Sequence, residues 1–169
     1  MAKISSLLKH VDVMIADPDD KIRALVKDVL HNAGFRNFVL VGNGHDALEK
    51  MRSQNIDLLI TDWRMQPVDG IELIDYVRTR PDSPNPYLPI IMLTGKAERR
   101  DVATARDIGV TEFLVKPFTA KALFERLVMV IENPRSFILS DDYHGPDRRR
   151  RTDIPPSGED RRKTPPISS

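Results

Sequence analysis

The sequence predicts an α/β fold, a doubly wound five-stranded parallel sheet with helices on both faces, followed by a flexible C-terminal tail. Short apolar runs alternate with amphipathic stretches of helical period through most of the chain. Two of the runs, 58–61 and 90–93, are apolar almost throughout, as expected of central parallel strands that are covered on both faces. From Asn133 onward the chain is rich in Pro, Asp, Arg and Ser and lacks apolar periodicity. We therefore divide it into a folded domain at 1–132 and a tail at 133–169 that is extended or disordered when free.

The elements of the folded domain follow from these patterns in order. A first strand at 11–16 leads into a helix at 19–33, and Gly34 lies where a helix C-terminus favours glycine. The same unit then repeats, which gives five βα units and a doubly wound sandwich. The four further strand–helix pairs are 38–41 with 45–53, 58–61 with 70–79, 90–93 with 98–108, and 113–115 with 120–131.

Composition excludes several classes of protein. The 169 residues carry a formal net charge of only +1, which argues against a strongly basic nucleic-acid binder, and we expect no specific DNA binding. The chain has no cysteine, hence no disulfides or thiolate metal sites, as is usual in a reducing cytoplasm. No apolar run is long enough for a signal peptide or a membrane span. We expect a soluble, cytoplasmic protein.

Polar residues end four of the five predicted strands. Asp17 follows the first strand, Asp62 the third, Thr94 the fourth and Lys116 the fifth. In doubly wound sheets the chemistry lies beyond the carboxyl ends of the strands, where these residues are expected to gather. Any one of them alone could simply end a strand in solvent, but the set of four favours a functional site.

With Met65, Asp69-Gly70 and Lys116-Pro117-Phe118 in the same order and spacing, this constellation resembles the receiver domain of two-component response regulators over residues 11 to about 132. The resemblance implies that Asp62 is a phosphoacceptor, that Thr94 holds a phosphoryl oxygen and that Lys116 pairs with the charged group. It also implies a cis peptide bond before Pro117. Phosphoryl transfer to a carboxylate needs such a nucleophile and fixed donors aimed at the equatorial oxygens.

The family's magnesium ion would be held here by Asp17, Asp62 and the backbone carbonyl of Arg64. One departure weakens this site: Pro18 occupies the position of the family's second adjacent acid, and its side chain cannot bind a metal. Asp19 is a possible substitute, through water, because Mg²⁺ readily keeps several waters.

Three further positions each have a functional and a structural interpretation. Arg64 and Lys96 place cations at the rim of the site, where they favour an acidic partner or a phosphate, or are solvated loop residues. Phe113 stands at the family's aromatic switch position, or is a core phenylalanine, and it lacks the hydroxyl of a tyrosine.

The tail contains a nearly duplicated cassette, Gly-Pro-Asp-Arg-Arg-Arg at 145–150 and Gly-Glu-Asp-Arg-Arg-Lys at 158–163. Arginine pairs bidentately with phosphate and with the O6/N7 edge of guanine, and aspartate accepts from the N1 and N2 donors of guanine. Guanidinium planes also stack on bases. A ligand with two guanines and two phosphates about a two-fold axis matches two such cassettes, and cyclic di-GMP is that ligand.

The combination resembles the CheY-like cyclic di-GMP effectors of the Cle group, which carry an arginine-rich C-terminal segment. It implies a protein that binds cyclic di-GMP, engages the flagellar motor switch, and modulates motility and surface attachment, with possible recruitment to the motor or cell pole. Phe137, Ile138 and Leu139 are expected to dock on the receiver. The implied ligand-binding residues are Asp147, Arg148, Arg149 and Arg150, then Asp160, Arg161 and Arg162, with Tyr143 extending the first group.

Three alternatives stay open at this point. The chain could be a single-domain response regulator that signals only through phosphorylation of Asp62 by a histidine kinase. The tail could instead bind polyanions such as RNA or anionic membranes without specificity, although an acid before each arginine pair weakens such binding. An autonomous enzyme is the least favoured class, because a receiver catalyses only its own phosphorylation and dephosphorylation.

Overall fold

The computed structural model describes residues 6–95, 99–134 and 136–147. A parallel five-stranded sheet with the order β2-β1-β3-β4-β5 forms its centre, as the sequence predicts. The order reverses direction at β1, because β1 pairs with both β2 and β3. The strands are β1 (Asp12–Ala16), β2 (Asn37–Val41), β3 (Leu58–Asp62), β4 (Ile90–Thr94) and β5 (Glu112–Val115).

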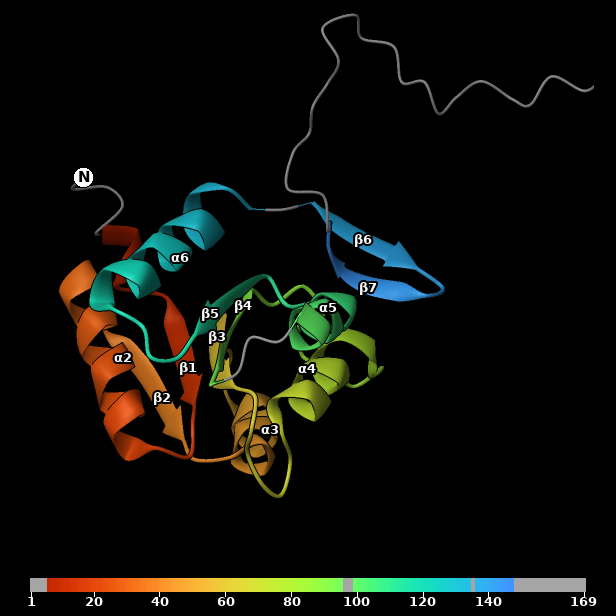
Figure 1. Cartoon of the computed structure of the whole chain (residues 1–169), viewed down its shortest axis with the longest axis horizontal. Helices are drawn as coiled ribbons and strands as arrows, with labels where there is room; N and C mark the ends of the chain where they lie inside the picture. Colours follow the sequence, from red (N-terminus) through yellow and green to blue (C-terminus); the bar gives the residue numbers. More distant parts are fainter. Residues whose placement is uncertain (1–5, 96–98, 135, 148–169) are drawn as a thin grey trace, which may run out of the picture.

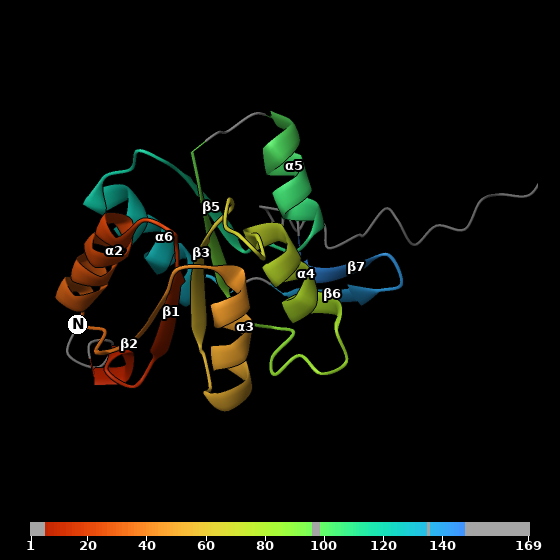
Figure 2. The same ribbon diagram turned by 90° about the horizontal axis from the view of Figure 1, so that it is seen from below.

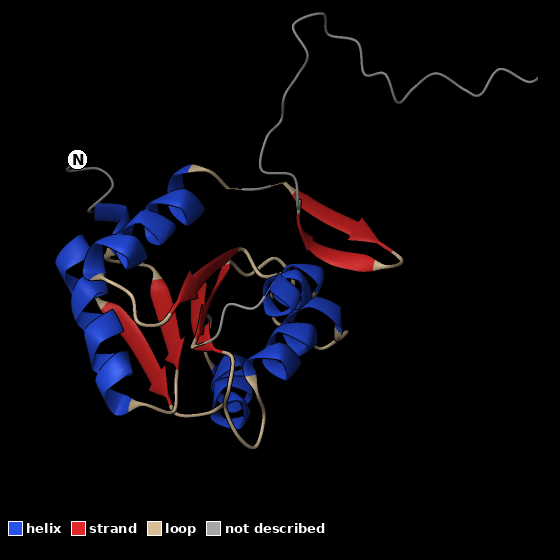
Figure 3. Cartoon of the chain, viewed as in Figure 1, coloured by secondary structure: helices blue, strands red, loops and turns tan. Residues whose placement is uncertain are grey.

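Five helices cover the sheet in two layers (Figures 1 and 3). Helices α2 and α6 lie on one face, and α3, α4 and α5 lie on the other. Along the chain, one helix follows each of the five strands, as the predicted βα units require. Their bounds are α2 (Asp20–Ala33), α3 (Gly44–Ser53), α4 (Gly70–Thr79), α5 (Arg99–Asp107) and α6 (Ala120–Glu132).

The core is divided by the sheet into two clusters, because successive side chains of a strand point to opposite faces. Along β1, Met14 packs toward α3 and α4, whereas Val13 and Ile15 pack toward α2 and α6. The strands β3 and β4 are buried over their whole length. This double coverage explains why their sequences are nearly continuous apolar runs.

Local sequence signals fix the helix ends. Asp19, Asn43, Asp69 and Thr119 each accept a hydrogen bond from a backbone N–H of the helix that follows, so four side chains act as N-caps. Gly34 ends α2 with φ at 115°, a left-handed conformation that glycine adopts without steric cost.

The chain beyond α6 forms a two-stranded antiparallel hairpin, β6 (Phe137–Ser140) and β7 (Tyr143–Pro146). The expectation of an extended or disordered chain from residue 133 onward is therefore wrong for these ten positions. The physical reason is docking: the Phe137 ring packs edge-on against Tyr87, with ring centroids 4.7 Å apart. Figures 1 and 2 both show the hairpin beside α4, as its contacts with that helix require. The predicted docking of Phe137 is confirmed.

Arg78, at the end of α4, is the centre of this contact. Its side chain is buried, with Nε and Nη2 donating to the Gly109 carbonyl and Nη1 to the Pro86 carbonyl. The guanidinium also lies 5.3 Å from the centre of the Phe137 ring. Burial lowers the pKa of Arg78 to about 10, against a small opposing influence of Tyr143. Each nitrogen of the buried guanidinium thus donates to a carbonyl, and the group also lies near an aromatic ring.

Two glycines let the hairpin approach the receiver closely. A Cβ at Gly145 would lie 2.8 Å from the Gly109 Cα and 2.5 Å from the Tyr143 hydroxyl. A Cβ at Gly109 would lie 2.8 Å from the His144 carbonyl oxygen, and its φ of +96° already disfavours other residues. The cassette glycine at 145 therefore has a packing role in the fold.

Candidate functional site

Four polar residues meet at the carboxyl edge of the sheet. Asp62 and Thr94 are the last residues of β3 and β4, and Asp17 and Lys116 directly follow β1 and β5. Because all five strands are parallel, these positions lie at the same edge. Asp17, Asp62 and Thr94 are buried, so the sequence-predicted set forms a shielded polar cluster.

Lys116 joins the two carboxylates. Its Nζ lies 2.5 Å from Oδ2 of Asp17 and 3.1 Å from Oδ1 of Asp62. The second oxygen of Asp17 accepts from the backbone N–H of Asp19 at 2.8 Å. An ammonium group between two buried carboxylates neutralises part of their charge, which burial would otherwise make costly.

The electrostatics of the pair follow from this arrangement. Burial raises the pKa of the Asp62 carboxyl above its ordinary value, and the hydrogen bond and charge of Lys116 only partly oppose that shift. Burial alone would lower the pKa of the Lys116 ammonium, but its bonds to Asp17 and Asp62 outweigh this and raise it. Lys116 is therefore fixed as a cation at neutral pH.

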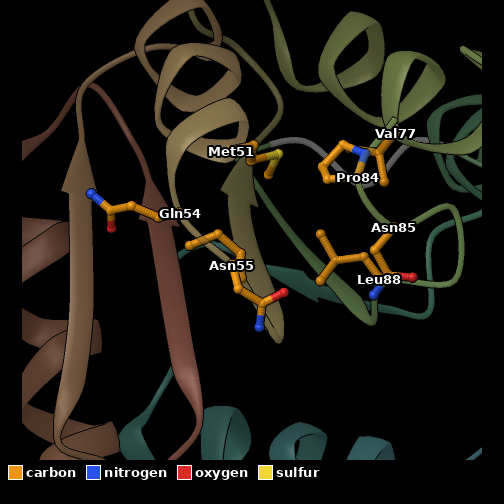
Figure 4. Close-up of a pocket in the computed structure, with 8 residues that line it drawn as sticks. Met51, Gln54, Asn55, Val77, Pro84, Asn85 and Leu88 are labelled. Atoms are coloured by element: carbon orange, nitrogen blue, oxygen red, sulfur yellow. The ribbon is translucent and has the colours of Figure 1, made fainter. Parts of the chain in front are cut away.

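A cleft of about 290 Å³ opens next to Lys116 and is lined by Asp62, Trp63, Arg64, Gly95 and Lys116. It gives a phosphoryl-sized group a path to the Asp62 carboxylate. A second cavity lies far from this chemistry, between Met51, Val77, Pro84 and Leu88 (Figure 4). Its volume of about 10 Å³ has room for about one water and for no ligand.

The loops around the site are held by backbone contacts. The Gly70 N–H donates to the Trp63 carbonyl at 2.8 Å, and a Cβ at Gly70 would lie 2.2 Å from the Asp62 carbonyl oxygen. Only glycine allows the start of α4 to come this close to the end of β3. The predicted cis peptide bond Lys116–Pro117 is confirmed, and Gln66–Pro67 is a second cis bond that the sequence analysis does not predict.

A family model described as the response regulator receiver domain matches residues 13–128. The chain belongs to this family. The chemotaxis protein CheY-3 of Vibrio cholerae is 34% identical over 126 residues, covering 75% of this chain and 95% of that protein. The chemotaxis protein CheY of Pseudomonas aeruginosa is 36% identical over 120 residues, covering 71% and 95%. The solved structure of the chemotaxis response regulator CheY4 of Vibrio cholerae matches with a TM-score of 0.64 at 29% identity, covering 71% of this chain and 98% of that one.

Receiver domains typically bind Mg²⁺ at acidic residues, and this receiver has an unusual set of them. Asp17 and Asp62 are brought together, but Pro18 supplies no ligand, and one Asp19 carboxylate oxygen accepts the N–H of Lys21 at the start of α2. Within the described part of the chain, no group of three or more His, Cys, Asp or Glu residues could hold a metal ion. The donor set fits Mg²⁺ poorly, because both remaining carboxylates already bind Lys116.

The remaining predicted site residues lie elsewhere. Tyr143 is in the hairpin, where its hydroxyl donates to the Pro146 carbonyl at 2.8 Å. The hairpin approaches Gly109 and packs on Tyr87, which precede β5 and β4, so it lies at the amino edge of the sheet, opposite Asp62. Phe113 is half-buried and packs against the core. Lys96 and the tail residues Arg148, Arg149, Arg150, Asp160, Arg161 and Arg162 lie outside the described residues.

The sequence analysis missed two residues that line the cleft, Trp63 and Gly95. Their positions carry a usable signal, since each directly follows a predicted site residue, Asp62 or Thr94. No helix among the described residues is long and apolar enough to cross a membrane.

Proposed function

We propose that this protein is a cytoplasmic, CheY-like cyclic di-GMP effector. Its arginine-rich tail binds the dinucleotide, and its receiver domain engages a partner, the flagellar motor switch, to modulate motility and surface attachment. Two relatives are named chemotaxis proteins, which supports a partner in the motility apparatus. The chain acts as an adaptor and not as an enzyme.

The duplicated cassette is the observation that carries this proposal. Each copy presents one aspartate followed by two arginines, a set that matches one guanine on two edges and an adjacent phosphate. The first copy begins at a fixed point of the fold, because the Asp147 N–H donates to the Ser136 carbonyl at 2.7 Å. The hairpin thus supports a ligand site that starts at the amino edge of the receiver sheet.

The proposal is tested by calorimetric titration of cyclic di-GMP into the full chain and into two sets of variants. Replacing Arg148, Arg149, Arg161 and Arg162 by Ala is expected to weaken binding at least about a hundredfold, since one bidentate arginine–guanine pair is worth about 1–3 kcal/mol. The matched control removes two exposed cations of α3, Lys50→Ala with Arg52→Ala, and should leave affinity unchanged.

Specificity is measured with GTP and cyclic di-AMP as competitors. Replacing Asp147 and Asp160 by Glu keeps the charge but moves each acceptor, so guanine-selective affinity should fall. Unchanged affinity in this pair of variants, or equal binding of cyclic di-AMP, would count against guanine recognition. A steep loss of binding with salt for any nucleic acid would mark a generic polyanion binder.

A response regulator driven by Asp62 phosphorylation alone is the second candidate. It is favoured by the cleft beside Asp62 and by the adjacent Lys116 and buried Thr94. In this reaction an Asp62 oxygen bonds to phosphorus while the bond from phosphorus to the donor's leaving group breaks. Intact-mass measurement after incubation with acetyl phosphate and Mg²⁺ tests it: no added phosphoryl group would remove this candidate.

A further inference from the structure

We propose that the Lys116 ammonium is the resident cation of this receiver's acidic site, and that proline at position 18 leaves Mg²⁺ without the ligand it needs to displace Lys116. The proposal concerns the site at Asp62 and is independent of ligand binding by the tail. It rests on three observations, which concern the two carboxylates, their neighbour Asp19, and Pro18.

The first observation is that the oxygens of the site are largely in use. Oδ2 of Asp17 and Oδ1 of Asp62 both contact the Lys116 Nζ, at 2.5 and 3.1 Å, and Oδ1 of Asp17 accepts the Asp19 N–H. Magnesium requires near-ideal octahedral geometry at about 2.0–2.1 Å from its oxygens, and an ammonium group in the same space excludes it. A divalent ion must therefore displace the lysine before it can bind Oδ2 of Asp17 or Oδ1 of Asp62.

The second observation removes the nearest substitute. Asp19 is exposed, and its Oδ1 accepts the Lys21 N–H at 2.9 Å, which caps α2. To act as a metal ligand through that oxygen, Asp19 would have to give up the cap. Loss of an N-cap destabilises the helix, because a backbone N–H of its first turn loses its partner. The Oδ1 oxygen of Asp19 is thus committed to the helix cap.

The third observation is the residue between these acids. Pro18 lies between Asp17 and Asp19 and carries neither a side-chain oxygen nor a charge. A carboxylate there would add a negative charge, which both attracts Mg²⁺ and replaces a coordinated water. Without it, Lys116 has only a weak competitor for Asp17 and Asp62.

The experiment is a Mg²⁺ titration of the full chain, followed by the emission of Trp63 and in parallel by calorimetry. Trp63 is the only tryptophan of the chain and lines the cleft beside Asp62, so its emission reports on that site. Four proteins are compared: the natural chain, Pro18→Asp, Pro18→Ala and Lys116→Met. Pro18→Ala is the matched control, because it removes the proline without adding an acid.

We expect Pro18→Asp to bind Mg²⁺ at least about tenfold more tightly than the natural chain, because affinity for such ions follows the number of charged ligands. Pro18→Ala should bind as weakly as the natural chain. Lys116→Met, once circular dichroism confirms its fold, should also bind more tightly because the competing cation is gone. The comparison of Pro18→Asp with Pro18→Ala does not depend on that third variant.

Two results would overturn the proposal. Equal affinities of the natural chain and Pro18→Asp would show that position 18 does not limit metal binding. Equal tightening in Pro18→Asp and Pro18→Ala would assign the effect to proline's backbone and not to the missing carboxylate.

Discussion

At the scale of single residues, Asp62 and Lys116 show how burial sets the chemistry of this site. The ionised Asp62 carboxylate is disfavoured by burial, although Lys116 supplies a charge and a hydrogen bond 3.1 Å away. Lys116 must divide its attraction between Asp62 and Asp17, which is nearer. Ionised Asp62 therefore carries a cost in folding stability, as buried charged groups do.

The pH dependence of stability follows from the sign of this shift. The pKa of Asp62 is raised in the folded chain, so its ionised form destabilises folding. Below the ordinary carboxyl pKa of 3.8, Asp62 is protonated in both the folded and the unfolded chain and does not lower the free energy of unfolding. The free energy of unfolding falls as pH rises from there through the raised pKa of folded Asp62. Asp62→Asn cannot ionise, so it should melt at a higher temperature than the natural chain at neutral pH, and the difference should vanish in acid.

The difference in melting temperature is measured by thermal unfolding of both proteins from about pH 3 to about pH 7, a span that includes the usual pKa values of carboxyl groups. Asp75→Asn makes the same substitution at an exposed carboxylate of α4 and serves as the control. A natural chain that is more stable than Asp62→Asn at neutral pH would contradict the assigned direction.

At the scale of elements, α4 connects the two functional ends of the receiver. Its first residue, Gly70, contacts the Asp62 carbonyl, and near its other end Arg78 holds the hairpin through Phe137. The hairpin therefore behaves as part of the receiver fold, although it follows the last helix of the family's domain.

This docking predicts a measurable contribution of Phe137 to stability. Phe137→Ala removes the contacts with Tyr87 and Arg78 and should lower the free energy of unfolding by about 1–2 kcal/mol, less than the value for a fully buried ring. Phe124, which is 47% exposed on α6, provides the matched control. Its replacement by Ala should change stability by less than about 0.5 kcal/mol. Equal effects of the two substitutions in urea unfolding would show that the hairpin is not docked.

The sequence predicts the elements in which apolar residues recur with a clear strand or helix period. Every predicted strand and helix of the sheet domain differs from the structure by at most one residue at either end. The hairpin escapes prediction because its strands are short, its turn at Asp141 and Asp142 lacks glycine, and β7 contains Gly145 and Pro146. Its stability comes from Arg78 and Tyr87, which are distant in sequence and so leave no local signal.

The sequence also predicts the four central residues of the site. Asp17, Asp62, Thr94 and Lys116 come together because parallel strands bring their carboxyl ends to one edge. Lys116 is divided between two carboxylates at 2.5 and 3.1 Å, and one oxygen of Asp19 caps α2 at 2.9 Å. Such details need coordinates.

At the scale of the whole molecule, the cleft beside Asp62 and the origin of the tail lie at opposite edges of one sheet. Asp62 ends β3 at the carboxyl edge, and the hairpin approaches Gly109 and packs on Tyr87 at the amino edge. A ligand on the tail therefore does not need to touch the Asp62 site to change which partner the receiver contacts. The proposed function places the signal at the tail and not at Asp62.

The most direct test is a calorimetric titration of cyclic di-GMP into the full chain and into a chain that ends at Asp147. The shorter chain keeps the docked hairpin, so it removes the arginines without uncovering Arg78. The account predicts tight, guanine-selective binding by the full chain and none by the shorter one. Equal binding by both chains, or by neither, would contradict the claim that the arginine-rich tail senses the dinucleotide.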